Sequence, residues 1–277
     1  MSVVYAVLAT FAIGLSDFLA SDVTKRTRSS EATSTMLFSG VVLMVVTTLF
    51  WPGEPTATDL VYGALAGVAN GVAILLLFVA YSRASLHSTA PVAAVVMSCG
   101  PVLWDVLVLG NMPSTVASVG LSLGVVAIAL SSYERGQSGS GFSGVFVAAL
   151  AGIAFSVLLI LLNYIGDAAG GSPLLVQRFV AFLVAMSVSR STGPRIFPKA
   201  RADFITSLWV GAFAAGAVIL FIMAIREGSL AVASVVSSQY AAVAVLLGVL
   251  VRGQRMWWWQ GLGLGGSSIA VALIAIG

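Results

Sequence analysis

Charged residues are scarce in this sequence, and cysteine and histidine occur once each. Of its 277 residues only 8% are charged, whereas soluble domains contain about 25%. So few charges cannot cover a water-facing surface, which excludes a disordered chain and a nucleic-acid-binding domain. Cys99 alone cannot form an intrachain disulfide, and His87 alone cannot supply a zinc site of several histidines. We expect no metal and no cofactor, and we expect His87 to be solvated at the start of a helix.

Apolar residues dominate the chain instead. They make up 59% of it, and the mean hydropathy is +1.07. A membrane-spanning helix needs roughly 20 apolar residues, and ten such segments follow one another, separated by short breaks, several of them rich in glycine and proline. The segments are 2–22, 33–51, 57–81, 87–109, 113–132, 142–163, 173–190, 203–225, 230–250 and 256–276. The sequence therefore predicts an all-α polytopic membrane protein with ten transmembrane helices, embedded in a lipid bilayer.

The two halves of the chain match one another. Three sets of residues recur at offsets of 140 to 143 positions: FVAYSR (78–83) with FIMAIR (221–226), Gly120 and Gly124 with Gly261 and Gly265, and Ser16 with Ser156. These matches follow the same helix order, which indicates a duplication into five-helix halves, 1–135 and 141–277. Because five is an odd number, the second half enters the membrane from the opposite side, so we expect two inverted five-helix repeats.

A family resemblance rests on the same residues. The chain has a first helix of small residues, turns at 83–85 and 226–229, Pro101 late in the fourth helix, and a glycine-rich last helix in each half. Together these features resemble the EamA family of the drug/metabolite transporter superfamily over essentially the whole chain. The resemblance implies export or exchange of small metabolites without ATP, through a central cavity lined mainly by helices one, three, four, six, eight and nine.

The resemblance has one departure. Many EamA proteins carry a Glu-Arg pair after the fourth and ninth helices, whereas this chain reads Gly-Asn-Met at 110–112 and Arg-Gly-Gln-Arg at 252–255. Any role of that glutamate is therefore not transferable to this chain.

Basic residues fall on one side of the predicted helices. Of the 13 lysines and arginines, eleven lie in or next to odd-numbered loops, Arg226 lies in an even-numbered loop, and Arg178 lies inside the seventh helix. The positive-inside rule places the odd-numbered loops in the cytoplasm and both termini outside. The family resemblance implies cytoplasmic termini, and we follow the charges because they act directly on insertion. We expect a multi-pass protein of the plasma membrane, in a bacterium the inner membrane.

Asp17 is the first candidate functional residue. A carboxylate near the bilayer centre costs at least about 2.5 kcal/mol on insertion scales. Asp17 follows Ala6, Ala9, Ile13 and Ser16 at helical spacing, on a face of small residues that can line a cavity. One interpretation is a coupling carboxylate that holds a proton or a cationic substrate in turn. The alternative is that the first helix ends early and leaves Asp17 near the membrane surface.

Asp105 and Arg178 form a second pair of candidates. Asp105 lies on the face of the fourth helix that carries Ser98 and Pro101, and Arg178 is five residues into the seventh helix. Both are expected towards the outer side. A structural Asp105–Arg178 ion pair is one interpretation, since a lone arginine inside a helix needs a counter-ion or must snorkel. A gate or a substrate contact is the other.

Neutral polar residues complete the candidates. Asn70 ends a segment in which glycine recurs every four residues, and such a stripe lets another helix approach closely. Ser238, Gln239 and Tyr240 form the densest polar stretch within a span, and Asn163 lies near the end of the sixth helix. Each side chain can hydrogen-bond a solute, and each can equally hydrogen-bond a neighbouring helix.

Three functions compete for this sequence. A secondary transporter moving a small organic metabolite, with or without protons, fits the duplicated ten-helix pattern. A membrane-embedded enzyme is disfavoured because the chain has no carboxylate cluster and no GxSxG or HExxH motif. A flippase for lipids or lipid-linked sugars requires a lateral opening and a basic head-group pocket. Two interior carboxylates and one arginine favour an amino acid, an amine or another cationic or zwitterionic compound. We expect the single chain to be the functional unit, with no nucleic-acid partner.

Overall fold

The computed structural model describes residues 2–108, 110, 114–132, 139–226, 240–253 and 256–276. Within these ranges it leaves out the side chains of residues 2, 3, 98, 102, 105, 106, 128, 129, 131, 132, 139–142, 167, 222, 225, 226 and 275. The described part is all α-helical, apart from one short 3-10 helix, η1 (Asp167–Ala169). Its ten α-helices are α1 (Ser2–Val23), α2 (Ser29–Leu49), α3 (Ala57–Arg83), α4 (Leu86–Leu107), α5 (Thr115–Ser132), α6 (Gly139–Leu162), α7 (Ser172–Thr192), α8 (Arg201–Arg226), α10 (Tyr240–Arg252) and α11 (Trp258–Ile276).

These helices confirm a membrane-spanning protein. Among the described residues, six helices are long and apolar enough to cross a bilayer, namely α1, α2, α3, α6, α7 and α8. The predicted segments agree with the observed helices to within a few residues, except that α2 begins at Ser29 instead of residue 33. Its polar residues can be buried there because Ser34 Oγ donates to the Ser30 carbonyl and Thr35 Oγ1 to the Glu31 carbonyl, which satisfies both hydroxyl groups. Of the predicted segment 230–250, residues 230–239 lie outside the described part.

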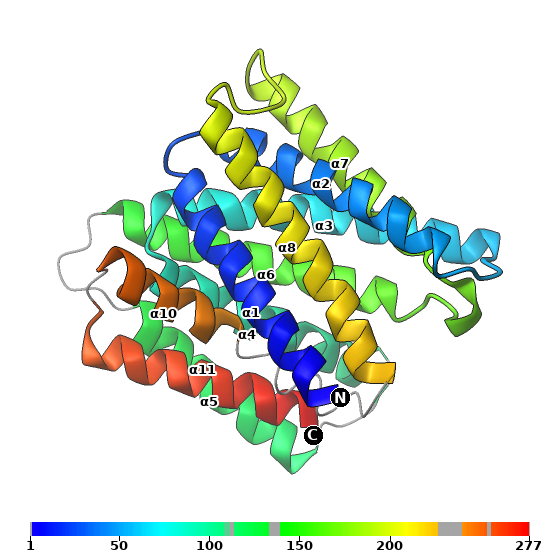
Figure 1. The fold of residues 1–277 in the computed structure, drawn as a ribbon. Helices are drawn as coiled ribbons and strands as arrows, with labels where there is room; N and C mark the ends of the chain where they lie inside the picture. The colour runs from blue at the N-terminus through cyan, green and yellow to red at the C-terminus, as the bar shows by residue number, and fades with distance from the viewer. Residues whose placement is uncertain are drawn as a thin grey trace.

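The helices pack mainly between the two halves of the chain. In the described part, α3 packs against α6 and α7, α1 against α8 and α10, and α5 against α11. The α2–α7 pair and the α5–α11 pair lie at opposite ends of the bundle, as Figure 1 shows at its top and bottom. In the same view α1 begins and α11 ends at the lower right of the bundle.

The glycine stripe of α3 is a packing surface, as predicted. A methyl group placed on Gly63, Gly67 or Gly71 would lie within 2.9 Å of a carbonyl oxygen of α7. These distances are shorter than van der Waals contact, so only glycine allows the two helix backbones to approach this closely. Asn70, next to this stripe, is buried, and its Nδ2 has no hydrogen-bond partner among the described residues.

Two even-numbered loops are joined by backbone hydrogen bonds. The loop before α3 and the loop before α7 exchange two of them, Glu54 N to the Ala168 carbonyl (2.9 Å) and Gly171 N to the Trp51 carbonyl (3.1 Å). Asp59 in the first turn of α3 also accepts from Gly166 N at 2.8 Å. These bonds hold α2 and α3 to α6 and α7 at this end of the bundle.

Thr56 caps α3 and thereby holds Asp59 in place. Its Oγ1 accepts from Asp59 N at 3.2 Å, and its backbone N–H donates to Asp59 Oδ2 at 2.8 Å, which together form a capping box. Losing such a cap costs about 1 kcal/mol, so we expect Thr56→Ala to lower the Tm of the purified protein by about 2–4 °C. Thr47→Ala is the control, because Thr47 Oγ1 bonds only to its own helix. Equal Tm changes in the two variants would contradict the capping role.

Candidate functional site

Asp17 lies in the interior of the bundle, next to two tyrosines. Helix α1 continues past it to Val23, six residues or about 9 Å further along the helix axis. The helix therefore does not end early. The Asp17 carboxyl interacts with the side chain of Tyr81 from α3 and with Tyr240, the first residue of α10. We call Asp17, Tyr81 and Tyr240 the interior cluster.

The interior cluster has unused hydrogen-bonding capacity. Tyr81 is 1% exposed, and its hydroxyl makes no hydrogen bond of ordinary geometry with any described residue, Asp17 included. Its ring packs on Phe78 with a centroid distance of 6.3 Å, which fixes its position. A buried hydroxyl without a partner costs free energy. A carboxylate beside two phenol groups can bind a proton or an organic cation, because hydroxyl oxygens also accept hydrogen bonds from an ammonium group.

A network of four charged residues lies beyond the interior cluster, at the odd-loop end of α1. Arg26 contacts Asp22 at 2.5 Å and Asp203 of α8 at 3.0 Å, and Arg252 of α10 contacts Asp22 at 3.3 Å. Burial lowers the pKa of Arg26, but the hydrogen bond to Asp203 and the charges of Asp22 and Asp203 outweigh burial and raise that pKa. We call Asp22, Arg26, Asp203 and Arg252 the charged network; it ties α1, α8 and α10 together.

Arg252 also contacts α1 just beyond Asp17. Its guanidinium lies 4.0 Å from the centroid of the Phe18 ring and donates to the Phe18 carbonyl at 3.3 Å and to Ser21 Oγ at 3.2 Å. Phe18 is the residue after Asp17. The contacts of Arg252 therefore lie on the odd-loop side of Asp17 along α1.

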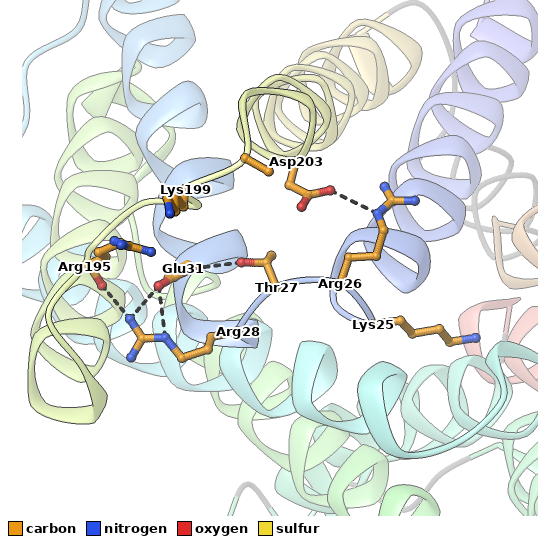
Figure 2. A pocket seen from close by; sticks show the side chains of 9 residues that line it. Lys25, Arg26, Thr27, Arg28, Glu31, Arg195, Lys199 and Asp203 are labelled. Carbon is orange, nitrogen blue, oxygen red and sulfur yellow. Dashed lines mark hydrogen bonds and ion pairs between the residues drawn. The ribbon is translucent and has the colours of Figure 1, made fainter.

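A cavity of about 760 Å³ lies beside the charged network, between the α1–α2 loop and the α7–α8 loop. Arg26 and Arg28 in its wall are neutralised by Asp203 and Glu31. Figure 2 shows Arg195 and Lys199 near Glu31, whereas Lys25 points away from them. Because the wall holds five basic and two acidic residues, the cavity is positively charged. We call it the basic pocket.

A second cavity, of about 530 Å³, is apolar and lies between α4, α5 and α6. Pro101 inside α4 has no N–H, so the carbonyl four residues earlier, that of Met97, loses its helical partner. Ser156 of α6 donates to this carbonyl at 3.1 Å. Cys99 contributes to the cavity wall, so its position is that of a packing residue.

Of the other predicted site residues, those whose side chains the structure describes do not join the interior cluster. Asn163 is exposed, one residue after the end of α6. Arg178 lies against α2, where its Cδ is 3.8 Å from a methyl group placed on Gly40, and it has no ion pair among the described residues. The side chains of Asp105, Ser98, Ser238 and Gln239 lie outside the described part, so the Asp105–Arg178 pair stays a prediction.

One expectation about a single residue was wrong. His87 is buried at 7% exposure, not solvated, and its Nε2 lies 3.2 Å from Ser85 Oγ. The serine-rich first turn of α4 supplies the polar contact that makes its burial possible. Among the described residues, no three His, Cys, Asp or Glu side chains lie close enough to hold a metal ion.

Sequence reasoning missed Tyr81 and the charged network. Tyr81 lies in the FVAYSR segment, which was used only as evidence of duplication. The residues of the charged network are separated by up to 230 positions, and the arginines were used only to predict orientation. Asp203, in the first turn of an apolar helix, is the one signal in the sequence that could have indicated a partner there.

Comparison with known proteins identifies the fold. No family model matches the sequence, and no curated protein matches it either. A crystal structure of a protein whose function is not named matches with a TM-score of 0.61, covering 96% of each chain at 16% sequence identity. The chain is a helical multi-span membrane protein. At this identity the match concerns the fold alone.

Proposed function

We propose that this multi-span protein is a secondary active transporter of the EamA type, which moves a small organic cation or zwitterion by alternating access. The observation that carries the proposal is the interior cluster, a carboxylate and two tyrosines contributed by three helices, with the charged network beyond it on the odd-loop side. A carboxylate inside a bundle is costly and is retained where it serves an ion or substrate pathway.

The first support for an inverted duplication is a repeated glycine contact. A methyl group on Gly14 of α1 would lie 2.7 Å from Val243 Cβ and 3.0 Å from the carbonyl oxygen three residues earlier in α10. A methyl group on Gly152 of α6 would lie 2.7 Å from Val96 Cβ and 2.8 Å from the carbonyl oxygen three residues earlier in α4. The glycines are 138 positions apart and the valines 147.

A second repeated contact joins the next helices. A methyl group on Gly67 of α3 would lie 2.7 Å from Val180 Cβ of α7, and one on Gly211 of α8 would lie 2.7 Å from Ser39 Cβ of α2. Each glycine also faces the carbonyl oxygen three residues before its partner. The glycines are 144 positions apart and the partners 141. Over the first four helices of the half, the offset thus rises by three positions from each helix to the next.

A third repeated contact lies at the helix ends. Asp59 is the third residue of α3 and accepts from Gly166 N, between α6 and α7; Asp203 is the third residue of α8 and accepts from Arg26 Nε, between α1 and α2. The aspartates are 144 positions apart, like Gly67 and Gly211. The first contact lies at even-numbered loops and the second at odd-numbered loops, so the two lie at opposite ends of the bundle. This supports an inverted relation between residues 1–135 and 141–277.

The two serines used in the sequence comparison do not make matching contacts. Ser16 Oγ donates to the Val210 carbonyl of α8, whereas Ser156 Oγ donates to carbonyls of α4. The duplication is therefore better supported by Gly14 and Gly152 than by the serine pair.

In the proposed mechanism, Asp17 holds either a proton or the cationic group of the solute. The charged network separates this site from the odd-loop side, so exposure to that side requires the Arg26–Asp203 and Arg252–Asp22 pairs to separate. Solute and proton then compete for one carboxylate, which couples their movements. One chain contains both halves and suffices for this cycle.

A thermal-shift screen of the purified protein against a metabolite panel tests this proposal. A ligand that binds the folded state raises the apparent Tm by mass action. We expect amines, amino acids or other cations to raise the Tm of the wild type and to lose that effect in Asp17→Asn. Hits confined to polyanions, or hits that Asp17→Asn leaves unchanged, would contradict the proposal.

A flippase is the second candidate, and the basic pocket favours it. Such a protein needs a positively charged site for a phosphate-bearing head group, and Arg195 and Lys199 have no acidic partner among the described residues. Transport of a fluorescent phospholipid between leaflets of proteoliposomes, without any response to amines, would favour this function over the first.

The orientation is tested by thiol labelling in intact cells. On a Cys99→Ala background we expect Ser191→Cys, exposed at the odd-loop end of α7, to be protected from an impermeant reagent added outside. Glu54→Cys, exposed in an even-numbered loop, should be labelled. The opposite pattern would place both termini in the cytoplasm.

A further inference from the structure

A groove of about 540 Å³ lies between α2, α3 and α7, and it is apolar along most of its length. Leu76 and Val79 of α3 and Val184 and Val188 of α7 form its walls. All four side chains are partly exposed, so the groove opens at the surface that faces the membrane.

The odd-loop end of this groove is polar and basic. Arg28, Arg83 and the hydroxyl groups of Ser82 and Thr192 line it there. Arg28 is paired with Glu31. Arg83 is exposed, and the structure gives its guanidinium one hydrogen bond, to the neutral Ser143 Oγ at 3.1 Å. The end of the groove therefore carries a positive charge that no described acidic residue balances.

The length of the groove matches one leaflet. Val72 at its inner end and Arg83 at its outer end are eleven positions apart on α3, which is about 16 Å along the axis. The hydrocarbon core of a bilayer is about 30 Å thick, so half of it is close to this length. The apolar wall is thus about as long as an acyl chain in one leaflet, and the basic end lies at the level of the head groups.

We propose that this groove is a binding site for an anionic phospholipid of the leaflet on the odd-loop side. An acyl chain lies along Leu76, Val79 and Val184, and the phosphate binds the Arg83 guanidinium and the neighbouring hydroxyls. Basic pockets between transmembrane helices bind anionic head groups in this way. Arg28 lines both this groove and the basic pocket, so the two cavities adjoin at this residue. A free phosphate ion would make no use of the apolar wall.

Native mass spectrometry of the purified full-length protein tests the site. We expect phosphatidylglycerol to be retained more strongly than phosphatidylcholine of the same chain length. Arg83→Gln should weaken phosphatidylglycerol binding about fivefold, the effect of removing one basic residue at a membrane surface. Arg201→Gln is the matched control, because Arg201 is exposed at the same end and lines neither cavity. Equal losses in the two variants would overturn the site in favour of diffuse attraction.

A second pair of variants tests the apolar wall. Val72→Trp fills the inner end of the groove at a residue that is 39% exposed, so the fold tolerates it. We expect it to lower phosphatidylglycerol retention without lowering the Tm, whereas Val61→Trp, 56% exposed and outside the groove, should have no effect. Inorganic phosphate should not compete with the lipid. Competition by phosphate, or equal retention of both lipids by the wild type, would overturn the proposal. Solute transport is measured in a separate experiment. A protein that transports no solute could therefore still show the expected lipid binding.

Discussion

Asp17→Asn should reach the membrane in normal amounts and fail to accumulate solute against a gradient. The substitution keeps the shape of the side chain and removes the charge that a proton or a cationic solute would neutralise. A hydrogen bond to a charged group contributes about 1.5–3 kcal/mol, so a cationic ligand found by thermal shift should bind about ten- to a hundredfold more weakly. Uptake into proteoliposomes should also lose its response to a pH gradient.

Glu54→Gln is the matched control for this experiment. It removes one carboxylate at an exposed loop position, distant from the interior cluster, and should leave binding and uptake unchanged. Tyr240→Phe should weaken binding less than Asp17→Asn, because it removes a hydroxyl and keeps the aromatic face. Uphill accumulation by Asp17→Asn at the wild-type level at every pH would show that Asp17 has no coupling role.

Gly14→Val and Gly152→Val should destabilise the protein strongly and to a similar degree. At both positions the added side chain would overlap a valine Cβ and a carbonyl oxygen of the opposing helix. Overpacking of this kind typically costs about 1–3 kcal/mol, and here the obstructing atoms include backbone, which cannot rotate away. The measurement is thermal unfolding in detergent, followed by tryptophan fluorescence.

Gly265→Val is the control that distinguishes steric overlap from the mere loss of a glycine. A methyl group on Gly265 of α11 meets no atom of the described residues within 4 Å, so the Tm of this variant should stay near that of the wild type. A large loss in Gly14→Val without one in Gly152→Val would contradict the equivalence of the two contacts, and with it the main support for the duplication.

The helices could be predicted from the sequence because a membrane span has a local signature. Twenty apolar residues define it without knowledge of any partner, and the glycine stripe of α3 similarly indicated a close neighbour. The sequence did not show that this neighbour is α7, since the carbonyl groups facing Gly67 exist in every helix. The early start of α2 was missed because composition alone does not show that buried Ser34 and Thr35 bond to carbonyls of their own helix.

The candidate site was predictable only in part. Asp17 was evident because a carboxylate in an apolar segment is rare. Its neighbours Tyr81 and Tyr240 are 64 and 223 positions away in the sequence. A tyrosine in a membrane span does not by itself indicate which residue it contacts. His87 was misplaced for a related reason, because burial of a polar side chain depends on a partner, here Ser85, whose orientation only the fold determines.

The packing of α3 between α6 and α7 bears on how the protein is made. A ribosome releases residues 1–135 into the bilayer before the glycine face of α3 has its partner, because that partner is α7. The glycine face of α3 therefore stays unpaired in the membrane at this stage. The final structure of the first half forms only after the second half has been synthesised. An isolated first half would expose that surface to other copies of itself. We therefore expect each half to be protected from degradation only when the two are coexpressed as separate polypeptides.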